Sequence, residues 1–355
     1  MKNSKIPKLL VQHLDGLYVV GGAIRDLLLN REPTEYDLIT TSPLEKIPLR
    51  TFAPSNNGKT VGVYLKGMKY DITRYEDLQE DLERRDFTVN SMAVPVEMDG
   101  TLDLKKLVDP CKGKDDLRKK ILRTFRAENL LQDPVRAIRG LRFVSQDGFN
   151  VETFTLAAMK EAMAKITLVA AERIFPPLEK FIHGKYFSKA CEVAKKLNVE
   201  RYLFIPHKNL DKAKHVDESC RWPVIFYNSS SFELFVKRVL PPNRVIRRVK
   251  RITYFASQVK KNDFSWTVKI KKDEVRCLIE LLKVFNIPAE AVERYGKTEL
   301  EISNSDLQEV GIVGKNIPKA MERIWKMVLT FEIPNERGEL LKFAERLKKD
   351  QLDRE

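Results

Sequence analysis

A pair of glycines between an apolar run and a helical segment, followed by a pair of acids, constrains this chain more than any other feature. The apolar residues 17–20 predict a buried strand, Gly21-Gly22 predicts a tight turn, and residues 23–29 predict a helix. The first amides of such a helix are free to hold phosphate. Thirteen residues later comes Glu35, followed by Asp37, in a second predicted strand. Alternate side chains of a strand share one face, so both carboxylates point the same way.

The two carboxylates form a candidate magnesium site. Mg²⁺ prefers hard oxygen ligands, which it shares with the phosphates of a substrate. Two such ions can hold the attacking and leaving oxygens of a phosphoryl transfer. A Gly-Gly turn or an acid pair alone is common in proteins without catalysis. Their order and spacing here favour nucleotidyl transfer.

Length and composition indicate a folded protein of more than one unit. The 355 residues are 43% apolar and 32% charged, which suits two or three cooperative units. No apolar run follows a basic start, and no stretch has membrane-spanning length, so we expect a cytoplasmic protein with no membrane partner. The four cysteines are scattered and there are only four histidines. This pattern predicts packing residues rather than a disulfide framework or a zinc site.

The net charge indicates a polyanionic partner. It is +14, from 64 Lys and Arg against 50 Asp and Glu, and it predicts salt-sensitive binding. The excess is concentrated between residues 237 and 272, with aromatic residues among the basic ones. Two interpretations stay open: a solvated helical face over core aromatics, or a surface that grips nucleic-acid phosphates. The candidate RNA-binding residues are Arg244, Arg247, Arg248, Lys250 and Arg251.

The first hundred residues differ in pattern from the remainder. Strand-like runs joined by Pro-, Asn- and Gly-containing turns predict an α/β unit. These runs are residues 18–20, 37–39, 61–65, 70–72 and 88–94. From about Leu117 onward, apolar residues recur at helical spacing and predict a mainly α remainder. Proline and the residue before it end helices. Breaks are therefore expected near Pro176-Pro177, Pro206, Pro241-Pro242 and Pro334.

Further motifs follow the acids in order. They are Arg84-Arg85-Asp86-Phe87-Thr88-Val89-Asn90, Asp109-Pro110, Gln132-Asp133-Pro134-Val135-Arg136 with Arg139 and Arg142, and Glu172-Arg173-Ile174. Together with the glycines and the acid pair, these motifs resemble those of the class II tRNA nucleotidyltransferases. The resemblance covers roughly residues 15–180, about half of the chain. This family contains the CCA-adding, CC-adding and A-adding enzymes and the bacterial poly(A) polymerases.

The resemblance implies a fold and a division of the chain. The expected fold is an α/β catalytic head of the nucleotidyltransferase, polymerase β-like type, followed by an all-α neck, body and tail. The expected limits are 1–116 for the head, 117–180 for a helical neck with the base-reading motif, and 181–355 for a helical body and tail that bind tRNA.

For catalysis, the resemblance implies that Glu35 and Asp37 bind Mg²⁺, although relatives typically have Asp-x-Asp at this place. Glutamate is longer by one methylene and still coordinates a hard cation. Asp71 matches a strand carboxylate that lies beside the pair in relatives, which makes it a candidate third catalytic acid. The alternative is a surface strand residue.

The resemblance also implies which residues hold the phosphates and the ribose. Gly21-Gly22 and Arg25 match a phosphate-holding segment, where a guanidinium can grip phosphate through its planar fork. Arg84, Arg85 and Asp86 match a ribose-and-phosphate motif that continues to Asn90. There the acid can accept from a 2'-hydroxyl.

Base reading is implied for the neck. Asp133 and Arg136 match the pair that reads the incoming base, and their i, i+3 spacing places them on one helix face that Arg139 and Arg142 continue. Gln132 stands where relatives usually have Glu. Glu172-Arg173 matches a motif that buttresses the neck helices in relatives, so a structural role is expected for these two residues.

The implied reaction is attack of the tRNA 3'-hydroxyl on the α-phosphorus of a nucleoside triphosphate, with release of pyrophosphate. CTP is the expected nucleotide, and ATP stays open. Only residues 75–83 separate the strand around Asp71 from Arg84, too few for the mobile loop of relatives that complete CCA, which favours CC addition. The alternatives are a full CCA-adding enzyme, a poly(A) polymerase, which lacks support because no basic signature follows Val20, and an RNA-binding protein without catalysis.

Overall fold

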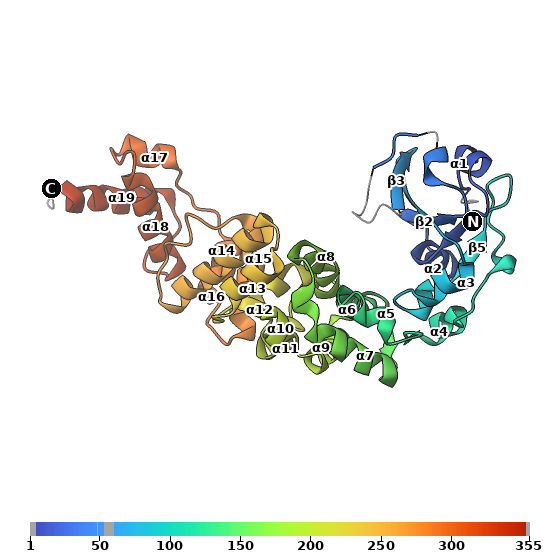
Figure 1. Ribbon diagram of the computed structural model, residues 1–355. Coiled ribbons are helices and arrows are strands. Elements are labelled where there is room, and N and C mark those ends of the chain that lie inside the picture. The colour runs from blue at the N-terminus through green and yellow to red at the C-terminus, as the bar shows by residue number, and fades with distance from the viewer. Residues whose placement is uncertain (1–4, 48, 53–59, 353–355) are drawn as a thin grey trace. The chain divides into compact units, whose positions relative to one another are not determined.

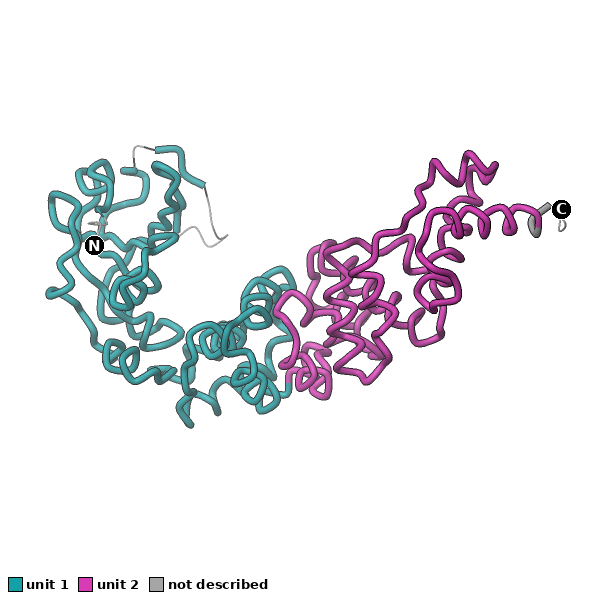
Figure 2. The backbone as a smooth tube through the Cα atoms, turned by 180° about the vertical axis from the view of Figure 1, so that it is seen from behind, with its two compact units in different colours: residues 1–198 teal, residues 199–355 magenta. Residues whose placement is uncertain are grey.

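The computed structural model describes residues 5–47, 49–52 and 60–352. The chain divides into two compact units, residues 1–198 and 199–355 (Figure 2). The expected limits at residues 116 and 180 both lie within the first unit, and the division into head and neck stays a prediction. Within the described ranges, no helix combines the length and the apolar character needed to cross a bilayer.

The first unit contains a mixed five-stranded sheet in the order β3-β4-β2-β1-β5 (Figure 1). Its strands are β1 Tyr18–Val20, β2 Glu35–Thr40, β3 Thr60–Leu65, β4 Met68–Arg74 and β5 Ala93–Pro95. β2 is parallel to β4, and the other neighbouring pairs are antiparallel. The predicted α/β head is therefore confirmed.

One predicted strand is wrong in its first half. Within residues 88–94, Thr88–Asn90 form the 3-10 helix η2, and only Ala93 and Val94 enter β5. The Thr88 hydroxyl donates to Asp116 at 2.8 Å, and the Asn90 amide donates to Asp86 at 2.9 Å. These local and long-range side-chain bonds favour a tight turn over a β ladder.

Strand alternation places the acids of β2. Tyr36 is buried and stacks on Tyr70 of β4, with ring centroids 5.6 Å apart. Asp37 is in register with Asp71 of β4 and with Val20 of β1. Because successive side chains alternate, the two aspartates share the face opposite the tyrosines. They lie beside the end of β1, where the glycines follow.

Helix α3 (Leu78–Glu83) packs against the sheet beside these acids. Leu82 is buried in a cluster with Val20, Ile39 and Ala93. The Asp77 carboxylate caps the helix by accepting from the Glu80 amide at 2.8 Å. Only residues 75–77 connect β4 to α3. Arg84 and Arg85 follow this helix directly, and Arg85 therefore lies near Asp37.

The other elements of the first unit are mostly helical. They are α1 Lys8–His13, α2 Gly22–Leu28, η1 Leu44–Lys46, η3 Leu104–Lys106, α4 Gly113–Lys119, β6 Ile121–Leu122, α5 Glu128–Leu131, α6 Val135–Asp147, β7 Asn150–Val151, α7 Thr153–Ala164, η4 Ile166–Leu168, α8 Ala171–Ile182 and α9 Phe187–Lys196. The break predicted at Pro176-Pro177 is wrong, because both prolines lie inside α8. Ile174, Phe175 and Leu178 around them are buried, and this packing outweighs the two missing backbone donors.

The second unit is helical, as predicted. Its elements are α10 Val199–Leu203, α11 His207–Ala213, η5 Glu218–Cys220, α12 Arg221–Phe226, α13 Phe232–Val239, α14 Asn243–Lys260, α15 Lys272–Val284, α16 Glu290–Lys297, α17 Asn304–Glu309, α18 Asn316–Leu329 and α19 Arg337–Leu352. Pro206, Pro241-Pro242 and Pro334 lie between helices, where breaks are expected. A separate apolar cluster that includes Leu307, Ile324 and Leu340 joins α17, α18 and α19.

Candidate active site

The glycine turn and the acid pair lie together. Gly21 has a φ of 70°, which glycine adopts without strain. A Cβ atom at Gly21 would lie 3.4 Å from Asp37 Oδ2 and 2.8 Å from Arg85 Nη1. The turn therefore allows a carboxylate and a guanidinium to approach the backbone closely, as a phosphate site beside a metal site requires.

The three acids of the sheet create a strongly negative face. Burial raises the pKa of Asp37, Arg85 opposes this shift, and the charges of Glu35 and Asp71 add to it. Asp71 Oδ1 is buried and has no hydrogen-bond partner among the described residues. The Glu35 side chain is 60% exposed, so the site opens toward solvent at its outer end.

Lys69 lies between two of these acids. Its Nζ atom is 2.5 Å from Asp71 Oδ2 and 3.8 Å from Glu35 Oε2. Burial opposes the charge of Lys69, but the hydrogen bond and the charge of Asp71 raise its pKa above the ordinary value. The sequence interpretation did not include this residue. The alternation Lys69-Tyr70-Asp71 was the available signal, because it places the lysine and the aspartate on one face.

These residues fit a divalent cation. Mutual repulsion of Glu35, Asp37 and Asp71 would be relieved by a cation, and the unpartnered oxygen of Asp71 is a hard ligand. In the part of the chain that the structure describes, no three acidic, histidine or cysteine side chains converge as a complete ligand set. A site completed by substrate phosphate needs only the acid pair from the protein.

A chain of hydrogen bonds connects Arg25, the predicted phosphate-binding residue, to α6. Arg25 Nη1 donates to Asn90 Oδ1 at 2.7 Å, and Asn90 Nδ2 donates to Asp86 Oδ1 at 2.9 Å. Arg139 Nε of α6 donates to Asp86 Oδ2 at 2.7 Å. Burial of Asp86 opposes its ionisation, but Arg139 and Asn90 hold its pKa far below the ordinary range. Asp86 also accepts from the Phe87 amide, so both oxygens are engaged, and its predicted contact with a 2'-hydroxyl stays a prediction.

Asp81 positions the two arginines of the motif. It is 5% exposed and accepts from Arg84 Nη2 at 2.6 Å and from Arg85 Nη2 at 2.9 Å. Burial opposes ionisation of Asp81, but the two guanidinium groups outweigh it and lower the pKa of the carboxyl. Sequence reasoning missed this residue. Its i, i+4 spacing to Arg85 on a helix was the signal that could have identified it.

The predicted base-reading residues are neighbours: Asp133 lies two residues before α6, and Arg136, in the first turn of α6, has its Nε atom 3.9 Å from Asp133 Oδ2. Arg136 Nη1 donates to the carbonyl oxygens of Arg84 and Asn129 at 3.0 and 2.7 Å. Arg173 Nη2 donates to Asp133 Oδ2 at 2.7 Å, whereas Asp133 Oδ1 is buried with no partner among the described side chains and backbone. The contact from Arg173 agrees with a buttressing role for that residue. One acceptor oxygen of Asp133 is therefore left without a protein partner, and base reading by Asp133 and Arg136 stays a prediction.

Arg142 completes the cationic face of α6. Its guanidinium lies 4.4 Å from the centroid of the Phe143 ring, which Arg25 also approaches at 5.2 Å. Burial and repulsion by Arg139 and Arg25 lower the pKa of Arg142 to about 10. Arg25 pairs with Asp26 and Arg139 with Asp86, whereas Arg142 Nε is buried and has no hydrogen-bond partner among the described residues. Such a cluster suits a polyanionic ligand.

The five candidate RNA-binding residues all lie on α14, but they differ in their contacts. Arg251 pairs with Glu274 through two bonds of 2.7 and 2.8 Å, and Glu274 is only 5% exposed. Arg248 lies 3.6 Å from Asp273, and Lys250 lies 2.9 Å from Glu233. Phe255, Phe264 and Trp266 are buried, whereas Tyr254 is 45% exposed. Arg244 and Arg247 are also exposed. Arg251 therefore belongs to an ion pair within the protein, whereas a role of Arg244 and Arg247 in gripping nucleic-acid phosphates stays a prediction.

We expect Arg247→Glu to weaken tRNA binding several-fold and to reduce the slope of log affinity against log salt by about 1. Arg247 is exposed and has no ion-pair partner among residues 5–47, 49–52 and 60–352. Arg251→Ala serves as the contrast, because losing its pair with Glu274 should lower stability instead. Filter binding at several salt concentrations measures both variants. An unchanged salt slope in R247E would leave α14 as a solvated face.

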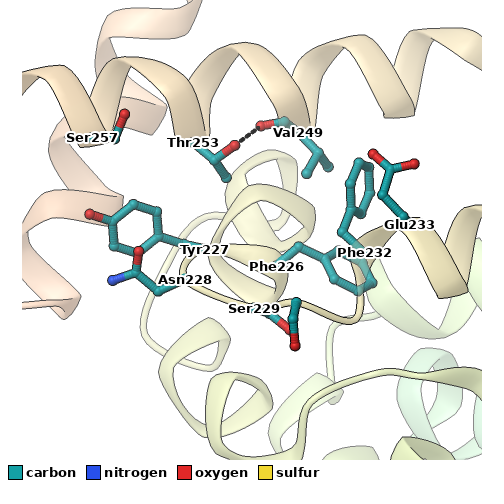
Figure 3. A pocket seen from close by; sticks show the side chains of 10 residues that line it. Phe226, Tyr227, Asn228, Ser229, Phe232, Glu233, Val249, Thr253 and Ser257 are labelled. Carbon is teal, nitrogen blue, oxygen red and sulfur yellow. Dashed lines mark hydrogen bonds between the residues drawn. The ribbon is translucent and has the colours of Figure 1, made fainter.

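Two pockets lie apart from the acid face. One, of about 400 Å³, is lined by residues 226–230 and by Phe232, Glu233, Val249, Thr253 and Ser257. Figure 3 shows Val249, Thr253 and Ser257 along α14, opposite the aromatic residues at the end of α12 and the start of α13. The other, of about 410 Å³, lies beside Asp81 and Arg84 and includes the connection 75–77. Neither pocket includes Glu35, Asp37 or the glycines.

The fold and the site define a nucleotidyltransferase with a polymerase-type head. Residues 17–75 and 59–123 match the family described as Poly A polymerase head domain, and residues 148–211 match the one described as Probable RNA and SrmB- binding site of polymerase A. The chain is 25% identical to a CCA-adding enzyme of Staphylococcus saprophyticus over 96% of both chains. It is 32% identical to a CC-adding tRNA nucleotidyltransferase of Halalkalibacterium halodurans over 55% of this chain and 51% of that relative.

A solved structure has the same fold. The CCA-adding enzyme of Bacillus stearothermophilus in complex with CTP superimposes with a TM-score of 0.70 at 23% identity, over 98% of this chain and 97% of that one. The chain belongs to the class II tRNA nucleotidyltransferase family. It is therefore an enzyme, and the predicted family resemblance is confirmed.

Proposed function

We propose that this protein adds CMP residues to the 3' end of tRNA without a template and releases pyrophosphate. The observation that carries the proposal is the close approach of the Asp37 carboxylate and the Arg85 guanidinium to the Gly21 backbone, in the space that a side chain at position 21 would fill. It places groups suited to phosphate and to metal within a few ångströms of each other. The names of the similar proteins support tRNA and CTP as substrates.

In this proposal Glu35 and Asp37 hold Mg²⁺, and Asp71 lies beside them as the third acid. When bound, the metal supplies charge neutralisation for the phosphates and lowers the pKa of a coordinated oxygen. The protein supplies positioning: Gly21-Gly22 admits the triphosphate, while Arg25 and Arg85 face it. Asp37 or Asp71 takes the proton of the attacking 3'-hydroxyl.

The remaining arginines orient the nucleotide. The residues beside the phosphates and the ribose are Arg84, Arg85, Asp86 and Asn90. Asp81 holds the two arginines, and Asn90 donates to Asp86. Asp133, with its free oxygen, and Arg136 present an acceptor and donors to the base edge. Arg139 and Arg142 add positive charge on the same helix face. Catalysis then depends mainly on position and charge.

The short connection between β4 and α3 supports CC addition. Three residues join these elements, and α3 itself fills the rest of the interval up to Arg84. No room remains there for a mobile loop. Full CCA addition is the second candidate, because a relative matched along nearly its whole length is a CCA-adding enzyme.

Incorporation assays on three tRNA transcripts test the proposal. The transcripts lack CCA, end in C, or end in CC, and each is offered labelled CTP or ATP with Mg²⁺. We expect CTP to label the first two and ATP to label none. Addition of A to the CC-ending transcript would replace CC addition with CCA addition. Absence of labelling on all transcripts would overturn the proposed function.

A further inference from the structure

Lys69 occupies the place between two acids where a cation is needed. It stands in register with Glu35 of the neighbouring parallel strand, and it lies two residues before Asp71 on its own strand. All three side chains share the acid face of the sheet. The Nζ atom contacts Asp71 at 2.5 Å and lies 3.8 Å from Glu35, and the side chain is only 27% exposed.

A lysine in this place competes with a metal ion. Its ammonium neutralises part of the charge of Glu35, Asp37 and Asp71 and engages one oxygen of Asp71, while the other oxygen of Asp71 keeps no partner in the described part of the chain. A divalent ion between the same acids would lie a few ångströms from the ammonium, and their repulsion is strong in a partly buried site. Metal and ammonium therefore cannot both bind these oxygens well.

A triphosphate changes this balance. It brings several negative charges to the glycine turn, next to the acid face, and so attracts the metal and the displaced ammonium together. A lysine ammonium is a compact point charge on a flexible stem and pairs readily with phosphate. The flexible side chain allows Lys69 to leave Asp71 without movement of β4.

We propose that Lys69 acts as an internal counter-cation, which lowers the affinity of the nucleotide-free enzyme for divalent metal and makes metal binding depend on the triphosphate. This inference rests on the proposed function, because it assumes that Glu35 and Asp37 bind the metal. Lys69 is a positioning residue: it acts through the acids and not on the reacting atoms.

Direct metal binding tests the inference. Mn²⁺ binding is measured by the loss of its free electron paramagnetic resonance signal, first without nucleotide and then with CTP. Lys69→Met should bind Mn²⁺ roughly tenfold more tightly than wild type without nucleotide, since a like charge is removed from the site. In K69M, CTP should then tighten Mn²⁺ binding less than it does in wild type.

Three control variants show whether a change in Mn²⁺ affinity comes from the charge at position 69. Lys66→Met changes an exposed lysine in the turn between β3 and β4 and should behave as wild type. Lys69→Arg keeps the charge and should keep the weak Mn²⁺ binding, which also shows that position 69 tolerates substitution. Asp37→Asn identifies the Mn²⁺ bound at the proposed site, because that binding should disappear.

The outcomes separate the two proposals. Equal Mn²⁺ affinity in wild type and K69M, with binding still abolished by D37N, would overturn the role of Lys69 and leave the metal site intact. Absence of any D37N-sensitive Mn²⁺ binding, with or without CTP, would overturn the proposed metal site itself. Tighter binding in K69M alone, abolished by adding D37N, is the expected result.

Discussion

Asp37→Asn should reduce CMP incorporation by about a thousandfold or more and leave tRNA affinity within about twofold. The substitution keeps the shape of the side chain but removes the charge that the proposed metal site requires. Asp37 lies at the centre of the acid face, in register with Asp71 and beside Gly21. We expect tRNA affinity to depend instead on the basic residues of α14, which lie in the other unit. Single-turnover kinetics and filter binding measure the two effects separately.

Asp115→Asn is the matched control for this prediction. Asp115 lies in the first turn of α4 with a side chain that is 61% exposed, and it carries the same charge as Asp37. Its incorporation rate should match that of the wild type. If D37N retained more than a tenth of the wild-type rate, while circular dichroism showed both variants folded, the metal assignment to β2 would be wrong.

The local features of the head could be predicted from sequence because they depend on short-range physics. Strand β1 is apolar and ends at two glycines, one of which adopts a positive φ, so the turn follows from backbone freedom alone. The common face of Glu35 and Asp37 follows from strand alternation. The triad of arginines on α6 follows from helical spacing, and the structure places Arg136, Arg139 and Arg142 along one side.

The errors arise where tertiary contacts override local preference. The β-branched pair Thr88-Val89 is typical of a strand, yet the bond from Thr88 to Asp116, 28 residues away, stabilises a turn. Pro176 is typical of a helix end, yet burial of its apolar neighbours keeps α8 continuous. Both contacts join residues that are distant in the sequence or depend on tertiary burial, so the spacing of apolar residues does not predict them.

The sequence also does not show which charged side chains pair with each other in the folded protein. Arg251 belongs to a basic run, but its fork is paired with the buried Glu274 on another helix. Lys69 and Asp81 are ordinary charged residues until the sheet and α3 bring them to the acid face. Charge runs therefore predict a polyanion partner for the whole chain, while the fold decides which members of the run are free to bind it.

Asp86→Ala should lower the free energy of unfolding by about 2–3 kcal/mol and reduce incorporation by about a hundredfold. The substitution leaves Arg139 without its carboxylate and Asn90 without its acceptor. Asn90, which accepts from Arg25 Nη1 at 2.7 Å, is then held less firmly, although Asp26 still accepts from the same guanidinium. The stability effect is smaller than for a fully buried pair, because the Arg139 side chain is 44% exposed and solvent screens it. Urea denaturation and single-turnover kinetics measure the two losses.

The pH dependence of this loss identifies its electrostatic origin. The folded pKa of Asp86 is depressed, so its stabilisation is fully present above the unfolded pKa of about 3.9 and is lost as pH falls toward the folded value. The stability gap between wild type and D86A should therefore be constant from about pH 5 to 8 and smaller by about 1 kcal/mol at pH 3. A gap that stays the same at pH 3 would mean that the side chain of Asp86 contributes packing and not charge, and that Arg139 is held by other groups.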